Sequence, residues 1–189
     1  MAALSRSAIE ALGFASLGRD VLISDKASFY GAARIAIADN VRIDDFCVLS
    51  AGAGGIDIGR NVHIAVYSSL IGRGRIELGD FCNISSRVSI YSSSDDYSGK
   101  RMTNPTVPEE YTGVTHADVK LGCHVIIGCS SVVLPGVKLD VGVAIGALSL
   151  VRDDCRAFGV FAGTPARLVG ERSRDLLEIE QRFRTGAAP

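Results

Sequence analysis

The stretch LGCHVIIGCSSVVLPGVKLDVGVAIGALSLV, residues 121–151, decides the fold, because a branched aliphatic residue returns at every sixth position. The six residues are Leu121, Ile127, Val133, Leu139, Ile145 and Val151. A period of six does not fit a helix of 3.6 residues per turn. Short β-branched stretches between Gly, Asp and Asn instead predict brief strands joined by tight turns.

The same spacing occurs earlier in the chain, in three runs of three. The runs are Ile37, Ile43 and Leu49; Ile58, Ile64 and Leu70; and Leu78, Ile84 and Ile90. Three steps of six residues make one triangular coil, and stacked coils place each aliphatic residue beneath its equivalent in the next coil. The repeat therefore predicts an all-β fold, a left-handed parallel β-helix of hexapeptide repeats with a protruding loop and a C-terminal helix.

The breaks in the repeat are also informative. The longer steps from Leu49 to Ile58 and from Leu70 to Leu78 contain glycines and predict widened corners, where glycine admits a positive φ. The large break is the loop at 92–118, SSSDDYSGKRMTNPTVPEEYTGVTHAD. An irregular excursion of this length is commonly functional. Because the repeat resumes at Val119, the loop must return near the corner that it left.

The chain divides into three parts on this pattern. Residues 1–20 are expected to form an N-terminal helical cap, and residues 21–157 the β-helix with the loop 92–118. Residues 158–189 form a C-terminal tail and helix. Leu176, Ile179 and Phe183 lie at helical spacing and predict a narrow apolar stripe that packs as a cap or against a partner subunit.

Charge and composition exclude several classes of function. The formal net charge is -1, from 20 Lys and Arg against 21 Asp and Glu, which predicts no binding of nucleic acid or of an acidic membrane surface. The N-terminus has no signal-peptide pattern, and no apolar run is long enough to span a membrane. We expect a cytoplasmic protein.

Three segments carry a resemblance to a known family. GCHVIIGCSSVVLPGVKL, AIGALSLVRDD and FAGTPARLVGE resemble the hexapeptide-repeat acyltransferases, especially the galactoside and maltose acetyltransferase branch. The resemblance covers residues 35–172 and implies a homotrimer, with acetyl-CoA as co-substrate in a groove between neighbouring β-helices and no metal. It implies transfer of an acetyl group to a hydroxyl or amine of a sugar or nucleotide sugar, in surface polysaccharide biosynthesis.

The resemblance also implies which residues bind coenzyme A. By position, Cys129, Ala147 and Arg152 match places where such enzymes contact the arm of the cofactor. Arg167 and Arg172 are the nearest cations for its phosphates, since a guanidinium pairs well with phosphate oxygens.

The catalytic base is where the chain departs from the family pattern. The sugar acetyltransferases have a histidine at the head of the loop, and the equivalent position here is Asp95, a carboxylate with an ordinary pKa of about 4 and a weak base for an alcohol. One alternative is that His116 is the base and that Asp95 or Asp96 orients its ring. The other is an amino-sugar acceptor, for which a carboxylate or the substrate itself suffices.

Four further residues are candidates for substrate binding. Asn83 and Ser85 flank Ile84 on the coil that feeds the loop, although corner hydrogen bonding would explain them equally well. Tyr97 lies in the loop. His63 precedes an inward residue and should point outward, to solvent or across a trimer interface.

Two other functions fit the same fold. One is a trimeric zinc enzyme of the carbonic-anhydrase type, in which His63, His116 and His124 would be the ligands; metal analysis would test it. The spacing from 116 to 124 and the lack of an evident acidic partner set speak against that reading. Separately, we expect His124 to be an exposed polar corner residue. The other is a noncatalytic β-helix scaffold, which failure to bind coenzyme A would support.

Overall fold

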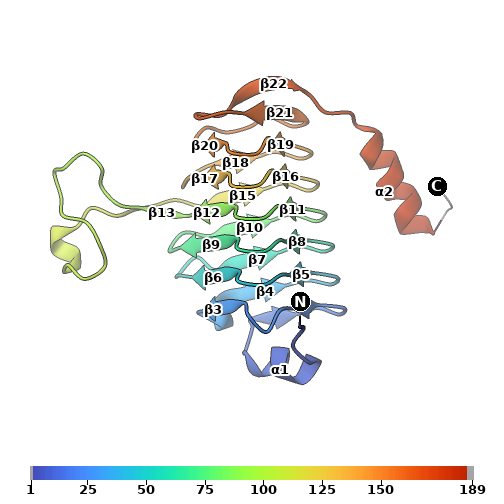
Figure 1. The fold of residues 1–189 in the computed structure, drawn as a ribbon, viewed down its shortest axis with the longest axis horizontal. Coiled ribbons are helices and arrows are strands. Elements are labelled where there is room, and N and C mark those ends of the chain that lie inside the picture. Colours follow the sequence, from blue (N-terminus) through green and yellow to red (C-terminus); the bar gives the residue numbers. More distant parts are fainter. Residues whose placement is uncertain (1, 187–189) are drawn as a thin grey trace.

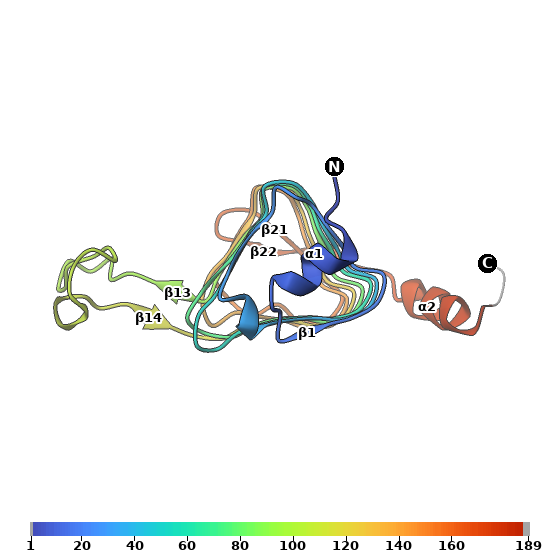
Figure 2. The same cartoon turned by 90° about the horizontal axis from the view of Figure 1, so that it is seen from below.

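The computed structural model describes residues 2–186, and the chain is a triangular solenoid (Figures 1 and 2). Its three walls are sheets of parallel strands, apart from one antiparallel pair at the C-terminal end. Neighbouring strands in a sheet come from successive coils, so the element order repeats through the three sheets in turn. The predicted all-β fold class, a left-handed parallel β-helix with a protruding loop and a C-terminal helix, is confirmed.

The strands have the following bounds. The first sheet contains β1 (Ser16–Leu17), β4 (Ile35–Ile37), β7 (Ile56–Ile58), β10 (Ile76–Leu78), β15 (Val119–Leu121) and β18 (Lys138–Leu139). The second contains β2 (Leu22–Ile23), β5 (Arg42–Ile43), β8 (His63–Ile64), β11 (Asn83–Ile84), β16 (Ile126–Ile127), β19 (Ala144–Ile145), β21 (Gly159–Ala162) and β22 (Arg167–Glu171). The third contains β3 (Ser28–Tyr30), β6 (Val48–Ala51), β9 (Ser69–Gly72), β12 (Ser89–Tyr91), β17 (Val132–Val133) and β20 (Leu150–Val151).

The three corners of the triangle differ in the segments attached to them. The loop corner joins the third sheet to the first, and the loop 92–118 leaves from it through β13 (Ser93–Ser94) and β14 (Thr115–His116). The helix corner joins the first sheet to the second, and α2 (Asp175–Thr185) docks beside it. The open corner joins the second sheet to the third. Figure 2 shows the loop and α2 projecting from opposite sides of the triangle.

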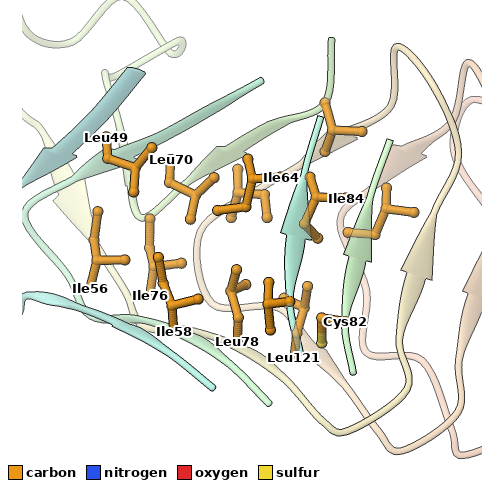
Figure 3. Close-up of a cluster of buried hydrophobic side chains, with 14 of the residues drawn as sticks. Leu49, Ile56, Ile58, Ile64, Leu70, Ile76, Leu78, Cys82, Ile84 and Leu121 are labelled. Carbon is orange, nitrogen blue, oxygen red and sulfur yellow. The ribbon is translucent and has the colours of Figure 1, made fainter. Parts of the chain in front are cut away.

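The core consists of columns of aliphatic side chains that run along the solenoid (Figure 3). In the second sheet one column is formed by register partners that are all buried: Ile43, Ile64, Ile84, Ile127 and Ile145. Burying an isoleucine side chain fully contributes about 1.5–3 kcal/mol, and each layer needs its neighbours for that burial. The predicted stacking of equivalent aliphatic residues is therefore confirmed.

The predicted widened corners lie one above another at the loop corner. Gly55 and Gly72 have φ of 80° and 149°, in the region that a side chain rarely adopts. A Cβ on Gly72 would lie 2.8 Å from the backbone nitrogen of Ser92 in the coil above. Glycine at this place lets the corner stack directly under the residue from which the loop leaves.

Both ends of the β-helix are covered, and strands of the β-helix sheets occur outside the predicted range 21–157. The N-terminal cap is α1 (Arg6–Ala11), which buries Ile9, but β1 already lies within the segment 1–20. At the other end β21 and β22 form an antiparallel pair within the segment 158–189. Residues 1 and 187–189 of these two predicted segments lie outside the described residues.

Candidate active site

A cavity of about 330 Å³ lies where the loop leaves the β-helix. Its lining is Tyr91, Ser93, Ser94, Asp95, Tyr97, Val114, Val132 and Leu134, and we call it the loop pocket. Two of the predicted residues, Asp95 and Tyr97, therefore lie together at one cavity. The pocket combines an apolar wall from β17 with hydroxyls and one carboxylate, the composition expected for binding a small molecule.

His116 lies beside the loop pocket but does not line it. Its Nδ1 is 2.8 Å from the hydroxyl oxygen of Ser93, its register partner across the β13 and β14 pair. Asp96 is occupied elsewhere, because its carboxylate accepts hydrogen bonds from the backbone and hydroxyl of Ser98 and from the backbone nitrogen of Arg101. These bonds, above all that from the Ser98 backbone, lower the pKa of Asp96. The ring of His116 thus has a hydroxyl partner rather than Asp95 or Asp96.

A second group of polar side chains lies on the second sheet, beside the open corner. Its members are Asp44, His63, Asn83 and Ser85, and we call them the polar patch. His63 and Asn83 are register partners on β8 and β11. His63 Nε2 is 2.8 Å from Asp44 Oδ2, and the Ser85 carbonyl oxygen accepts a hydrogen bond from the Ser68 hydroxyl at 2.8 Å.

Small residues continue the polar patch toward the C-terminal end of the solenoid. They are Gly128, Ala144, Gly146, Ala147 and Ala162. The coils approach closely here, since a Cβ on Gly128 would lie 2.5 Å from the backbone nitrogen of Ala147. Cys129 and Ala147 are both exposed at this corner, so an extended ligand could contact backbone groups along it.

The three predicted arginines do not lie together. Arg152 and Arg167 each contact Asp153, at 3.6 and 3.1 Å, on the last coil. Arg172 instead lies at the helix corner, where Nη1 donates to the carbonyl oxygens of His124 and Gly142 at 2.6 and 3.1 Å. Burial lowers the pKa of Arg172. This residue is an anchor for the tail that leads into α2, and not a neighbour of the other candidate cofactor contacts.

The expectation that His124 is exposed is wrong. Its side chain is only 11% exposed, its Nε2 is 2.6 Å from Glu180 Oε2 on α2, and its ring stacks on Phe81 with centroids 4.9 Å apart. His63, His116 and His124 lie on a sheet face, at the foot of the loop and at the helix corner. Within residues 2–186 no group of three His, Cys, Asp or Glu side chains could hold a metal ion.

The polar patch and the loop pocket lie at opposite ends of the third wall. Ser85 is at the open corner, and the loop pocket begins at Tyr91, the last residue of β12. The chain from Ser85 to Tyr91 could span at most roughly 20 Å if fully extended. It spans less here, because it turns at Arg87, whose φ is 60°. Asp44 and Tyr91 were not predicted from the sequence, because each is defined by a contact or a cavity rather than by a motif.

Comparisons with known proteins agree with this architecture. No family model matches the chain. The chain is 58% identical to the dTDP-4-amino-4,6-dideoxy-D-glucose acyltransferase of Escherichia coli over 187 residues, which are 99% of this chain and 97% of that protein. Within residues 2–186, none of the helices has the length and hydrophobicity to cross a membrane.

Solved structures include AntD, an N-acyltransferase from Bacillus cereus. AntD in complex with dTDP and 3-hydroxybutyryl-CoA is 41% identical, with a TM-score of 0.92 and 98% of each chain covered. A serine variant of AntD, in complex with dTDP-4-amino-4,6-dideoxyglucose and coenzyme A, superposes with a TM-score of 0.94. A maltose O-acetyltransferase from Clostridium difficile, 22% identical with a TM-score of 0.55 over 89% of this chain and 75% of its own, shares the fold.

Proposed function

The chain belongs to the hexapeptide-repeat acyltransferases, and we propose that it transfers an acyl group from coenzyme A to the amino group of dTDP-4-amino-4,6-dideoxyglucose or a closely related nucleotide sugar. The identity of 58% over nearly the whole length of both chains is the single observation that carries this proposal. The AntD complexes, which hold this nucleotide sugar and coenzyme A on the same fold, support it.

An amine acceptor accounts for the carboxylate at the head of the loop. Asp95 is a poor base for an alcohol but a good hydrogen-bond acceptor for an ammonium group. Variants of AntD substitute one serine and one aspartate that follows it by ten positions, the separation between Ser85 and Asp95 here. In the proposed site Asp95 contacts the amino group, and the Ser85 hydroxyl and Asn83 amide hold the sugar or the thioester oxygen.

A shared site between subunits would bring Ser85 and Asp95 to one substrate. In a single chain Ser85 lies at the open corner and Asp95 at the loop pocket, at opposite ends of one wall, which is a long separation for two groups acting on one amine. In the trimer that we propose, the open corners of three copies face the symmetry axis, so that the second sheet of one copy lies against the third sheet of the next. Exposed apolar side chains at this corner support the arrangement: Phe46 is 45%, Tyr67 50% and Leu148 73% exposed in the single chain.

Coenzyme A would lie along the small residues that continue the polar patch. The pantetheine arm is extended and can bond to exposed backbone at Cys129 and Ala147, while Arg152 and Arg167 are placed for phosphates at the end of the solenoid. Acetyl-CoA is the donor that we propose first, and 3-hydroxybutyryl-CoA, the ligand of AntD, is the alternative. The N-acylated nucleotide sugar would serve surface polysaccharide synthesis in the cytoplasm.

Thiol release from acyl-CoA tests this function. Acetyl-CoA and 3-hydroxybutyryl-CoA would each be assayed with dTDP-4-amino-4,6-dideoxyglucose and with the matched dTDP-sugar that carries a 4-hydroxyl. We expect turnover with the amino sugar alone, and a loss of about a hundredfold in Asp95→Asn. Equal turnover of the hydroxyl sugar would contradict N-transfer, and no thiol release with either donor would contradict the proposed reaction.

A further inference from the structure

The polar patch contains a histidine held by a carboxylate. His63 on β8 and Asp44, just after β5, come from successive coils, and their side chains meet at 2.8 Å. The Asp44 side chain is 15% exposed and the His63 side chain 40%, so the carboxylate is shielded while the ring still reaches solvent. Arg42 Nε donates a second hydrogen bond to Asp44 at 2.7 Å.

We propose that His63 takes the proton that the acceptor ammonium must lose before attack, and that Asp44 is the positioning residue for its ring. The inference rests on the proposed function, because only an amine acceptor arrives carrying this proton. An alkyl ammonium group is largely protonated at neutral pH and has no lone pair for attack on a thioester.

The hydrogen bond to Asp44 leaves the ring in a suitable form. With Nε2 donating its hydrogen to the carboxylate, Nδ1 of the neutral ring keeps its lone pair and can accept a proton. A carboxylate that orients an imidazole also stabilises the imidazolium once it forms. The arrangement is therefore that of a base with its orienting partner.

Position separates His63 from the other two candidates for this proton. His63 is the register partner of Asn83, and Ala65, two residues on, donates its backbone N–H to the Ile84 carbonyl, so Ser85 lies directly above Ala65. His116 is bonded to a serine hydroxyl at the foot of the loop, and among residues 2–186 its ring has no carboxylate partner. Asp95 lines the loop pocket, where the proposed site uses it as the hydrogen-bond acceptor of the ammonium group.

The groups that face His63 come from the two strands that flank β8. Arg42 lies on β5 and Asp44 directly after it, and the neutral Asn83 lies on β11. Burial opposes ionisation of Asp44, but hydrogen bonds from His63 and Arg42 outweigh it and lower the pKa of this carboxyl below its usual range. These hydrogen bonds thus favour the charged form of Asp44 beside the ring of His63.

The proton balance of the transfer is then complete. The ammonium gives one proton to His63 Nδ1, directly or through the Ser85 hydroxyl, and becomes a free amine. The amine nitrogen attacks the thioester carbonyl, the C–N bond forms, and the C–S bond breaks. The second proton on nitrogen goes to the departing thiolate of coenzyme A, and His63 releases its proton to solvent.

The test is kcat/KM for dTDP-4-amino-4,6-dideoxyglucose as a function of pH in His63→Gln, Asp44→Asn and His116→Gln. We expect His63→Gln to lose about a hundredfold at pH 7 and to approach wild type at high pH, where the substrate is already a free amine. Added imidazole should restore part of the loss. Asp44→Asn keeps the ring, so it should lose less, with a shifted pH profile and no rescue by imidazole.

The controls separate this inference from the proposed function. Glu77→Gln removes a charge from an exposed pair with Lys120 on the first sheet and should change neither profile nor rate. Wild-type kcat/KM in His63→Gln at every pH, or imidazole rescue of His116→Gln instead, would overturn the role of His63. In that case activity of the wild type and its loss in Asp95→Asn would leave the proposed function standing; an inactive wild type would remove both.

Discussion

Complementation between two inactive variants tests whether neighbouring subunits share the site. Ser85→Ala and Asp95→Asn would each be purified alone and after co-expression with distinguishable tags. Alone, each variant lacks one side of every site and should retain about a hundredth of wild-type turnover. We expect recovery on mixing, because Ser85 and the loop pocket lie at opposite ends of one wall in a single chain.

The size of the recovery follows from the geometry of a cyclic trimer. Each site would combine Ser85 of one copy with Asp95 of the next, so every mixed trimer has one intact site of three. With random mixing, about three quarters of the trimers are mixed, and thiol release should recover to about a quarter of wild type.

A second mixture tests the same model with both mutations on one chain. Wild type mixed equally with the double variant Ser85→Ala/Asp95→Asn should also give about a quarter of wild-type activity if the site is shared, but about half if each chain has its own site. Mixed single variants that remain at the residual level, although native mass spectrometry shows mixed trimers, would refute the shared site.

Three further changes test the fold and its assembly. Ile84→Ala removes a fully buried core side chain and should cost about 2–5 kcal/mol of unfolding free energy in urea, whereas the adjacent, outward Asn83→Ala should cost much less; equal losses would contradict the columns. Leu148→Asp places a charge at the proposed symmetry axis and should yield monomers in sedimentation. An intact trimer would show that the axis lies at another corner. Burial alone would raise the pKa of Glu180, but hydrogen bonds from His124 and Arg184 outweigh this effect, so that the pKa is lowered. The stability that ionised Glu180 gives to the docking of α2 is present above the ordinary carboxyl pKa and is lost as the pH falls through the lowered pKa. Hydrogen exchange in α2 should therefore rise below about pH 4, and it should also rise at neutral pH in Glu180→Gln. Unchanged protection in both cases would contradict the role of the Glu180–His124 pair in holding α2.

Local chemistry determined the β-helix, and the sequence alone was sufficient to predict it. Side chains at every sixth position must face one interior, and a widened corner needs glycine where φ is positive, so Ile84 and Gly72 could be placed without coordinates. Counting along the repeat also placed Asp95 at the head of the loop. These placements depend only on sequence neighbours or on the strict six-residue period. Steric limits on φ and the need to bury aliphatic side chains therefore determine them one residue at a time.

The contacts between outward side chains were decided only by the tertiary structure. Asp44 and His63 meet because β5 pairs in register with β8, which puts Asp44 two residues beyond Arg42, the register partner of His63, and because their outward rotamers are free of any core constraint. Glu180 reaches His124 only once Arg172 has directed the tail along the helix corner. A repeat specifies which face a residue occupies, whereas hydrogen bonds across coils depend on the exact stacking and on the path of segments that have no period.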